Sequence, residues 1–306
     1  MIKFKMELSQ NDKIIFEHLF YDARRSTREL AKIMHIKQPS VHARIKKLEE
    51  EGFISRYDSL ITIQALPLIY KMYYTSLSSE QVQEIVKMPV CFGLQKLFGE
   101  FTHQIFCFFK NKKQIKEFER YLPKKRTSQL LTKSHRLGGS IFDVKREPEV
   151  YKENTSKIKL DKTDIRLLHK MLIGGAKKTV VDLAKELNTT CAVIKYRKKK
   201  LIDNGYFLYF VSQPGEAFKS LKIAYHVFSL NKNFDLNIIK NFPRCVIAYS
   251  GDKTLTVIQL SLSFNDYLDY SNKLIQKLEL YTKDMKTFFV DKPVILNRLS
   301  EELLKS

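Results

Sequence analysis

The sequence predicts an α+β protein in which two winged helix-turn-helix units alternate with two ferredoxin-like units. Three observations lead to this prediction. The chain of 306 residues repeats itself at about half its length. Each repeat opens with three short amphipathic helical stretches followed by a strand-like stretch, and each continues with strand-like and helix-like stretches in the order βαββαβ. The apolar fraction of 44% is sufficient for packed cores.

The repeat is clearest in the three-helix units. Residues 8–61 and 160–213 align with each other, with one residue inserted near Gly174. The same tripeptide, LAK, stands at 30–32 and at 183–185. Because the ferredoxin-like order also recurs after each three-helix unit, we expect a duplication of the whole two-part unit.

Local patterns in the first copy predict three helices and a wing. An apolar stripe follows Asp12, which is the expected N-cap of the first helix. Ser26 has a glutamate three positions further on, as in a capping box at the start of the second helix. The third helix is expected over 38–50, and Gly52 breaks the chain after it. Residues 53–57 then alternate as a short strand.

Boundaries between the units follow from composition. The stretch 145–159 is polar, contains a proline and lacks an apolar period, which is typical of a linker. The expected segments are a winged helix-turn-helix at 1–62, a ferredoxin-like unit at 66–148, a linker at 149–159, a second winged helix-turn-helix at 160–213 and a second ferredoxin-like unit at 218–300.

Several short elements are expected within the ferredoxin-like units. Strand-like patterns stand at 140–144, 287–290 and 294–296, and a terminal helix is expected at 298–306. Gly251 stands in a hairpin turn, where a positive φ would suit glycine.

Charge favours a polyanionic partner. The 54 Lys and Arg residues exceed the 33 Asp and Glu residues, for a formal charge of +21. A basic but merely solvated surface is the alternative, yet basic residues concentrate on the third helix of both copies. An α-helix fits the DNA major groove, where glutamine can pair with adenine and cations can neutralise phosphates. The expected base-reading residues are Gln38, Ser40 and His42, and the expected phosphate-binding residues are Arg44, Lys46, Lys47, Arg56, Lys195, Arg197 and Lys199.

The half-chain unit resembles the Lrp/AsnC, or feast/famine, family of transcription regulators. The resemblance is carried by ELAK at 29–32, by SVHARIKKLEEEGFISRY at 40–57 and by Asp12. It implies that the third helix and wing bind double-stranded DNA and that the ferredoxin-like unit is a RAM-type domain that drives dimerisation. The second copy departs from the pattern, since LIDNG replaces LEEEG at 201–205. Two units in one chain imply a pseudo-dimer, which we expect to assemble into a further homo-oligomer.

The same resemblance implies an effector site. In this family a small molecule, often an amino acid, binds between RAM domains near a hairpin of glycine and an acidic residue. The matching positions are Gly99, Glu100, Gly251 and Asp252.

Two other functions stay open. Siroheme decarboxylases resemble this architecture, and His103, His135 and His226 are the histidines that could face a tetrapyrrole. A DNA-organising protein without sequence specificity would share the fold. The sequence contains no recognisable nucleophile–base set, phosphate-binding glycine loop or metal-ligand spacing, so it predicts a protein that is not an enzyme and has no cofactor. Apolar runs are too short to cross a bilayer, and the 4 cysteines lack close pairs, so we expect a cytoplasmic, nucleoid-associated protein.

Overall fold

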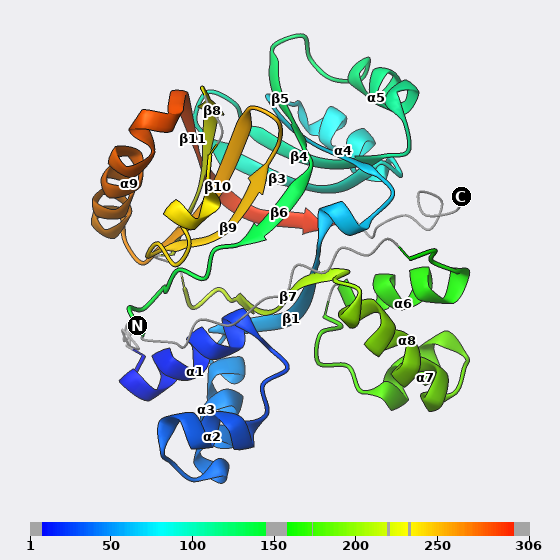
Figure 1. The fold of residues 1–306 in the computed structure, drawn as a ribbon, viewed down its shortest axis with the longest axis vertical. Helices are drawn as coiled ribbons and strands as arrows, with labels where there is room; N and C mark the ends of the chain where they lie inside the picture. The colour runs from blue at the N-terminus through cyan, green and yellow to red at the C-terminus, as the bar shows by residue number, and fades with distance from the viewer. Residues whose placement is uncertain (1–7, 145–157, 173, 219–220, 232–233, 297–306) are drawn as a thin grey trace.

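The computed structural model describes residues 8–144, 158–172, 174–218, 221–231 and 234–296. The two three-helix units lie side by side below a large sheet, and a two-stranded ribbon passes between them (Figure 1). The predicted α+β class, with winged helix-turn-helix and ferredoxin-like units each present twice, is confirmed. The predicted terminal helix at 298–306 and most of the linker fall outside the described residues.

The first three-helix unit consists of α1 (Gln10–Tyr21), α2 (Thr27–Met34) and α3 (Gln38–Glu50). The expected N-cap at Asp12 was wrong: Ser9 is the N-cap, and Asp12 is the third helical residue of its capping box. A carboxylate at that position accepts a hydrogen bond from the N-cap backbone. Asp12 therefore does mark the start of α1, but the helix begins one turn earlier than we expected.

The second unit consists of α6 (Lys162–Leu172), α7 (Val180–Leu187) and α8 (Cys191–Asp203). In both units the short middle helix begins at a capping box and ends at a left-handed residue, His35 at φ 54° and Asn188 at φ 51°. The shared ends confirm that the two units are copies of one structural pattern.

The wing strands of the two units pair with each other. β1 (Ile54–Ile61) and β7 (Phe207–Pro214) form an antiparallel two-stranded sheet, the wing ribbon, with Tyr57 opposite Ser212. The strand is longer than the expected 53–57, because its hydrogen-bond partner comes from the other copy and is invisible in the sequence of either copy alone.

Each helical unit is hydrogen-bonded to the wing strand of the other copy, through contacts that are equivalent in the two copies. The Ala23 N–H, just after α1, donates to the Phe210 carbonyl in β7, and the Ala176 N–H, just after α6, donates to the Tyr57 carbonyl in β1. Lys177 also lies over the Tyr57 ring at 3.5 Å. The two DNA-binding-type units are therefore held as one body by the wing ribbon rather than tethered loosely.

The two ferredoxin-like units share one nine-stranded sheet in the order β5-β2-β4-β3-β11-β8-β10-β9-β6. The first unit supplies β2 (Ile69–Thr75), α4 (Ser79–Lys87), β3 (Cys91–Phe98), β4 (His103–Phe109), α5 (Lys112–Glu119), β5 (Arg126–Leu131) and β6 (Lys133–Arg136). The second supplies β8 (Lys222–Leu230), the short 3-10 turn η2 (Leu236–Ile238), β9 (Cys245–Ser250), β10 (Thr254–Ser261), α9 (Phe264–Leu278) and β11 (Thr282–Leu296).

The last strand of each unit crosses into the sheet of the other. β11 begins against β8 and ends against β3, while β5 pairs with β2 and β6, one residue further along the chain, pairs with β9. The two predicted strands at 287–290 and 294–296 are thus parts of one strand, in which register shifts occur. These exchanged strands join the halves at the middle of the sheet, where β11 lies between β3 and β8, and at the edge formed by β6.

No strand forms at 140–144, contrary to the prediction. Instead, the backbone N–H groups of Ile141 and Phe142 donate to the carboxylate of Glu17, a fully buried residue of α1, at 3.1–3.2 Å. The apolar residues that suggested a strand anchor this segment against the first helical unit.

Side chains alternate between the two faces of the sheet. Tyr73 points outward into a cluster with Phe118 of α5, whereas Tyr74 points inward and stacks on Phe288 of β11 at 4.4 Å. The inner face carries the larger core, which joins both halves and both helical units. Figure 1 shows α4, α5 and α9 on the outer faces.

Gly251 does not adopt the positive φ that we expected. Its backbone lies so close to β5 that a Cβ would stand 2.2 Å from the Leu130 carbonyl oxygen. Glycine is required here for close approach between the two halves, not for turn geometry.

His226 on β8 provides a pH test of this core. Its Nε2 lies 2.8 Å from the Gln259 Oε1 and its Nδ1 lies 3.0 Å from the Thr287 Oγ1, and burial lowers its pKa to about 4. The unfolded chain therefore binds a proton more readily below about pH 6.5, so stability should fall as pH drops from 6.5 towards 4. From pH 7 to pH 5 this residue should account for a loss of about 2 kcal/mol in unfolding free energy.

Urea unfolding of the wild-type protein and His226→Gln at the two pH values measures this loss. The variant should lose about 2 kcal/mol less than the wild type between pH 7 and pH 5. Equal losses would show that His226 does not titrate in this way.

Candidate nucleic-acid interface and central pocket

The outward face of α3 carries the residues predicted to read bases. Val41, Ile45 and Leu48 are buried against the unit, which leaves the opposite face of the helix to solvent. That exposed face presents Gln38, Ser40, His42, Lys46 and Lys47. The structure therefore brings five of the predicted DNA-binding residues together on one helix face.

Arg44 is placed differently. Its Nη1 lies 2.8 Å from the Asp12 Oδ1 and donates to the Ser9 hydroxyl at 3.1 Å, so it ties α3 to the start of α1. Burial alone would raise the pKa of Asp12, but hydrogen bonds from Ser9 and Arg44 hold it below its ordinary value. Arg44 is thus engaged within the unit and orients the helix.

Arg197 repeats this arrangement in the second unit. Its Nη1 lies 2.6 Å from Asp161 and 2.8 Å from Asp164, and the Lys200 Nζ lies 2.9 Å from the same buried Asp164 carboxylate. The matching arginines of both copies therefore make equivalent contacts. The arginine that suggested phosphate binding in each third helix instead forms an ion pair that holds this helix to the first helix of its unit.

Arg56 lies in the wing ribbon. Its Nε donates to both carboxylate oxygens of Asp58 at 2.9 and 3.1 Å, and the buried Asp58 also accepts from the Gly174 N–H at 2.8 Å. Asp58 thus links the ribbon to the second unit, and the Arg56 side chain that it holds lines a pocket.

The outward face of α8 is basic but differs in character from α3. Lys195 and Lys199 are exposed, and between them Tyr196 is 70% exposed. Lys198 is half-buried near Arg24, and burial together with that cation lowers its pKa. The exposed faces of the two third helices thus carry different chemistry.

Additional cations lie beside α3 that the motif search missed. A shallow hollow on α2 and the following turn is lined by Arg28, Lys32, His35 and Lys37. The first helix of a helix-turn-helix crosses the DNA backbone, so these are further candidates for phosphate contact. The surplus of Lys and Arg between Arg24 and Lys37 was the available sequence signal.

The four positions implied as effector contacts do not form one site by their described contacts. Gly99 approaches Thr287 and Phe288 in β11, and the Glu100 carboxylate pairs with the Lys286 Nζ at 3.0 Å. Gly251 approaches Leu130 in β5, and Asp252 is exposed in the same turn. Each hairpin packs on a strand of the other half.

A pocket of about 240 Å³ lies between the wing ribbon and the inner face of the sheet. The first helical unit, both strands of the wing ribbon and both ferredoxin-like units contribute to its walls, so it exists only because the two copies are joined. The lining residues are Phe20, Arg56, Leu60, Tyr70, Phe92, Gln95, Phe106, Val211, Gln213, Pro214, Ile223, Tyr225, Val246, Ile247, Tyr249, Ile258 and Leu260.

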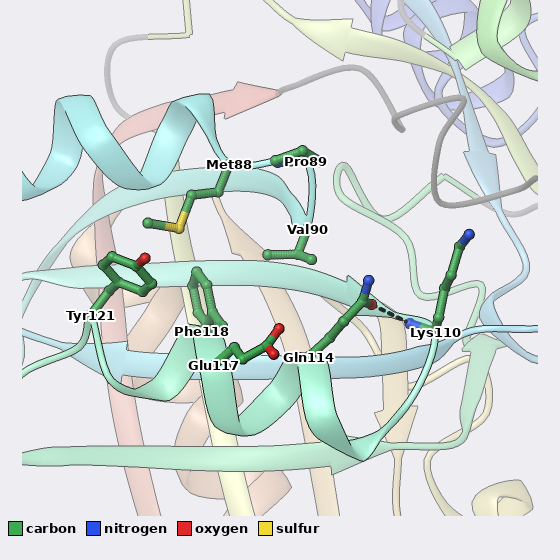
Figure 2. Close-up of a pocket in the computed structure, with 8 residues that line it drawn as sticks. All are labelled: Met88, Pro89, Val90, Lys110, Gln114, Glu117, Phe118 and Tyr121. Carbon is green, nitrogen blue, oxygen red and sulfur yellow. Dashed lines mark hydrogen bonds between the residues drawn. The ribbon is translucent and has the colours of Figure 1, made fainter.

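A second hollow of about 550 Å³ lies on the outer face of the first ferredoxin-like unit, between the turn before β3 and α5. Figure 2 shows Met88, Phe118 and Tyr121 gathered at one end and the Gln114 side chain bonded to the Lys110 backbone at the other. Beside the corresponding turn of the second unit, Arg244 grips the incoming segment that contains Asp143.

None of the three candidate tetrapyrrole-facing histidines lines the central pocket among the described residues. The Nδ1 of His103 lies 2.8 Å from the Thr102 hydroxyl, and burial and the neighbouring Lys96 lower its pKa. The Nε2 of His135 lies 2.8 Å from the Ser250 hydroxyl, and His226 is bonded through both ring nitrogens. The structure does not bring the three together.

Within the described part of the chain, no group of three or more His, Cys, Asp or Glu side chains could hold a metal ion. Among those residues, no helix is both long enough and apolar enough to cross a membrane.

Comparison with known proteins defines the class. Residues 8–55 match the winged helix-turn-helix DNA-binding family. The HTH-type transcriptional regulator FL11 of Pyrococcus furiosus is 27% identical over 116 residues, which cover 36% of this chain and 77% of that protein. FL11 of Pyrococcus horikoshii is 25% identical over 119 residues, 37% of this chain and 79% of that protein. The resemblance to the Lrp/AsnC regulators is confirmed, with their two-part unit duplicated in one chain.

The full-length architecture has a different relative. The crystal structure of the siroheme decarboxylase NirDL matches with a TM-score of 0.58 at 13% identity and covers 96% of both chains. Its complex with an iron-uroporphyrin III analogue matches equally well at 12% identity. At such identity the likeness shows the fold alone.

This finding overturns one prediction. We expected a protein that is not an enzyme, because the sequence lacks a recognisable catalytic set, and that prediction was wrong. The architecture that matches along nearly the whole chain is that of an enzyme, whereas the regulators match only about a third of the chain.

Proposed function

We propose that this chain is a sequence-specific, double-stranded-DNA-binding transcription regulator of the Lrp/AsnC type. The observation that carries the proposal is the exposed face of α3, where Gln38, Ser40 and His42 stand beside two lysines on a helix whose orientation is fixed by the Arg44–Asp12 pair. Amide, hydroxyl and imidazole groups can bond base edges, and lysines can neutralise phosphates.

The ion pairs within the protein reduce the number of basic residues that we expect to contact DNA phosphates. Arg44 and Arg197 are committed to carboxylates within the protein, and Arg56, held through its Nε by Asp58, lines the central pocket. Of the residues predicted from sequence to contact phosphates, the lysines remain, namely Lys46, Lys47, Lys195 and Lys199. Lys46 and Lys47 make only long contacts of 3.4 and 3.6 Å to glutamates one turn along α3, which DNA phosphates can replace.

Four phosphate contacts predict a moderate salt dependence. Affinity for duplex DNA should fall about 10²-fold between 50 and 200 mM salt, because each neutralised phosphate releases condensed counterions. Titration of a fluorescent duplex at several salt concentrations measures this slope. Binding that does not change with salt, or no binding at 50 mM, would contradict the proposal.

A DNA-bound regulator would act in the cytoplasm at the nucleoid, and the duplicated unit supports use of the chain as its own pseudo-dimer. Further homo-oligomerisation, and an amino-acid-like effector near Gly99–Glu100 or Gly251–Asp252, stay predictions. Sedimentation with and without candidate amino acids addresses both.

A second candidate function is that of a siroheme-decarboxylase-like enzyme, which the full-length fold match favours. Such a protein would bind a tetrapyrrole that carries many carboxylates. Adding siroheme or haem to the purified protein and recording its visible spectrum separates the two proposals. A stoichiometric shift of the Soret band would favour the enzyme over the regulator.

A further inference from the structure

We propose that the pocket between the wing ribbon and the sheet binds a small amphipathic molecule with an apolar, preferably aromatic, body and a single anionic group such as a carboxylate. The site differs from the glycine–acid hairpins, none of whose residues line it. A volume of about 240 Å³ is slightly below the usual range of small-molecule pockets, so the ligand must be small.

Arg56 supplies the recognition of the anion. Its Nε is held by Asp58, which fixes the plane of the guanidinium, while neither of its terminal nitrogens has a partner among the described residues. A guanidinium held at one edge presents its remaining N–H groups in a fixed geometry that suits a carboxylate. Gln213 faces Arg56 across the ribbon and offers a neutral amide beside it.

Aromatic side chains form the walls of the pocket, against which the apolar body of the ligand would pack. Tyr70, Phe92 and Phe106 come from the first half, and Tyr225 and Tyr249 come from the second. The rings of Tyr70 and Tyr249, which belong to different halves, lie 5.9 Å apart. An aromatic ligand body would find ring faces and edges on both sides, which is the usual composition of a specific small-molecule site.

The polar side chains of the sheet that form the floor of the pocket, Gln95 and Tyr225, already have hydrogen-bond partners. The Gln95 side chain donates to Gln104 and is hydrogen-bonded to Tyr225, whose pKa is raised to about 12 by burial. The floor is therefore uncharged at neutral pH. With one cation in the lining and no charge on the floor, the pocket fits one anionic group and not a ligand with many carboxylates.

The probe for a direct test is 1-anilinonaphthalene-8-sulfonate, an aromatic anion whose fluorescence rises in apolar sites. The wild-type protein should bind it at one saturable site per chain. The compound 3-phenylpropionate should displace it, and 3-phenylpropionamide, which lacks the charge, should displace it at least about tenfold less well.

Two variants locate the site. Arg56→Gln should weaken probe binding about tenfold or more, and Val246→Trp should abolish it by filling the pocket. The matched control is Arg24→Gln, because Arg24 also donates to an aspartate two residues away and is similarly exposed, but lies outside the pocket lining. Its affinity for the probe should be unchanged.

Unfolding curves and probe stoichiometry identify any variant that has lost its fold, since a loosened core binds many probe molecules weakly. The proposal is overturned if the wild type shows no saturable site, if Val246→Trp binds the probe as the wild type does, or if acid and amide compete equally. All measurements are made without DNA, so failure here leaves the proposed DNA binding standing, and failure of DNA binding leaves this site standing.

Discussion

Replacing Gln38, Ser40 and His42 together by alanine is expected to remove sequence discrimination while it leaves the nonspecific affinity for DNA at low salt largely unchanged. These side chains are exposed on α3 and, apart from a 3.0 Å bond from Gln38 to Thr27, make no described contact that stabilises the unit. Each good base contact contributes about 1–3 kcal/mol of discrimination, so affinity for a preferred site should drop about 10²-fold or more. Competition between the preferred duplex and a scrambled one measures the loss.

The matched control is Lys195→Ala with Lys199→Ala in α8. These exposed lysines are predicted to contact phosphates, so their loss should weaken binding to all duplexes alike and lower the salt slope by about 2. If the α3 variant lost affinity equally for both duplexes, the assignment of base reading to α3 would be wrong.

Arg244→Met is expected to lower the free energy of unfolding by about 3 kcal/mol, the largest stability change among our predictions. The nearly buried Arg244 guanidinium bonds the Asp266 and Asp143 carboxylates at 2.9–3.0 Å and the Ser140 carbonyl at 3.1 Å. Its removal leaves two carboxylates close together and frees the segment that joins the first half to the second. Urea denaturation measures the change.

Lys286→Met provides the control for Arg244→Met. Lys286 pairs with Glu100 at 3.0 Å with both side chains well exposed, so its loss should cost less than about 1 kcal/mol. Equal effects of the two substitutions would show that the Arg244 cluster does not hold the halves together.

Local periodicity and capping signals were sufficient to predict the helices of both units. The helix boundaries at Thr27 and Gln38 lie within a residue of the expected ones, because side-chain caps and apolar stripes act within a few residues. The repeat also predicted that the second half would copy the first.

Contacts between the copies were beyond sequence reasoning. The extension of β1 along β7, the crossing of β11 from β8 to β3 and the close approach of Gly251 to Leu130 all depend on a partner more than a hundred residues away. The central pocket belongs to the same class, since its lining comes from both copies.

For the predicted site residues, too, local features could be predicted from the sequence and contacts between distant residues could not. Exposure of Gln38 and His42 follows from helical period alone. The engagement of Arg44 with Asp12 and of Arg197 with Asp164 does not, because a basic residue on a helix flank has the same pattern whether it meets a phosphate or a carboxylate.

The central claim is that one chain reads DNA with two unlike helix-turn-helix units held together by the wing ribbon. Selection of bound duplexes from a random pool, followed by sequencing, tests it most directly. The account predicts enrichment of a site in which an α3-specified half adjoins a different, less constrained half, and loss of only the first half's preference in the α3 variant. A pool without enrichment, or a strict palindrome, would contradict it.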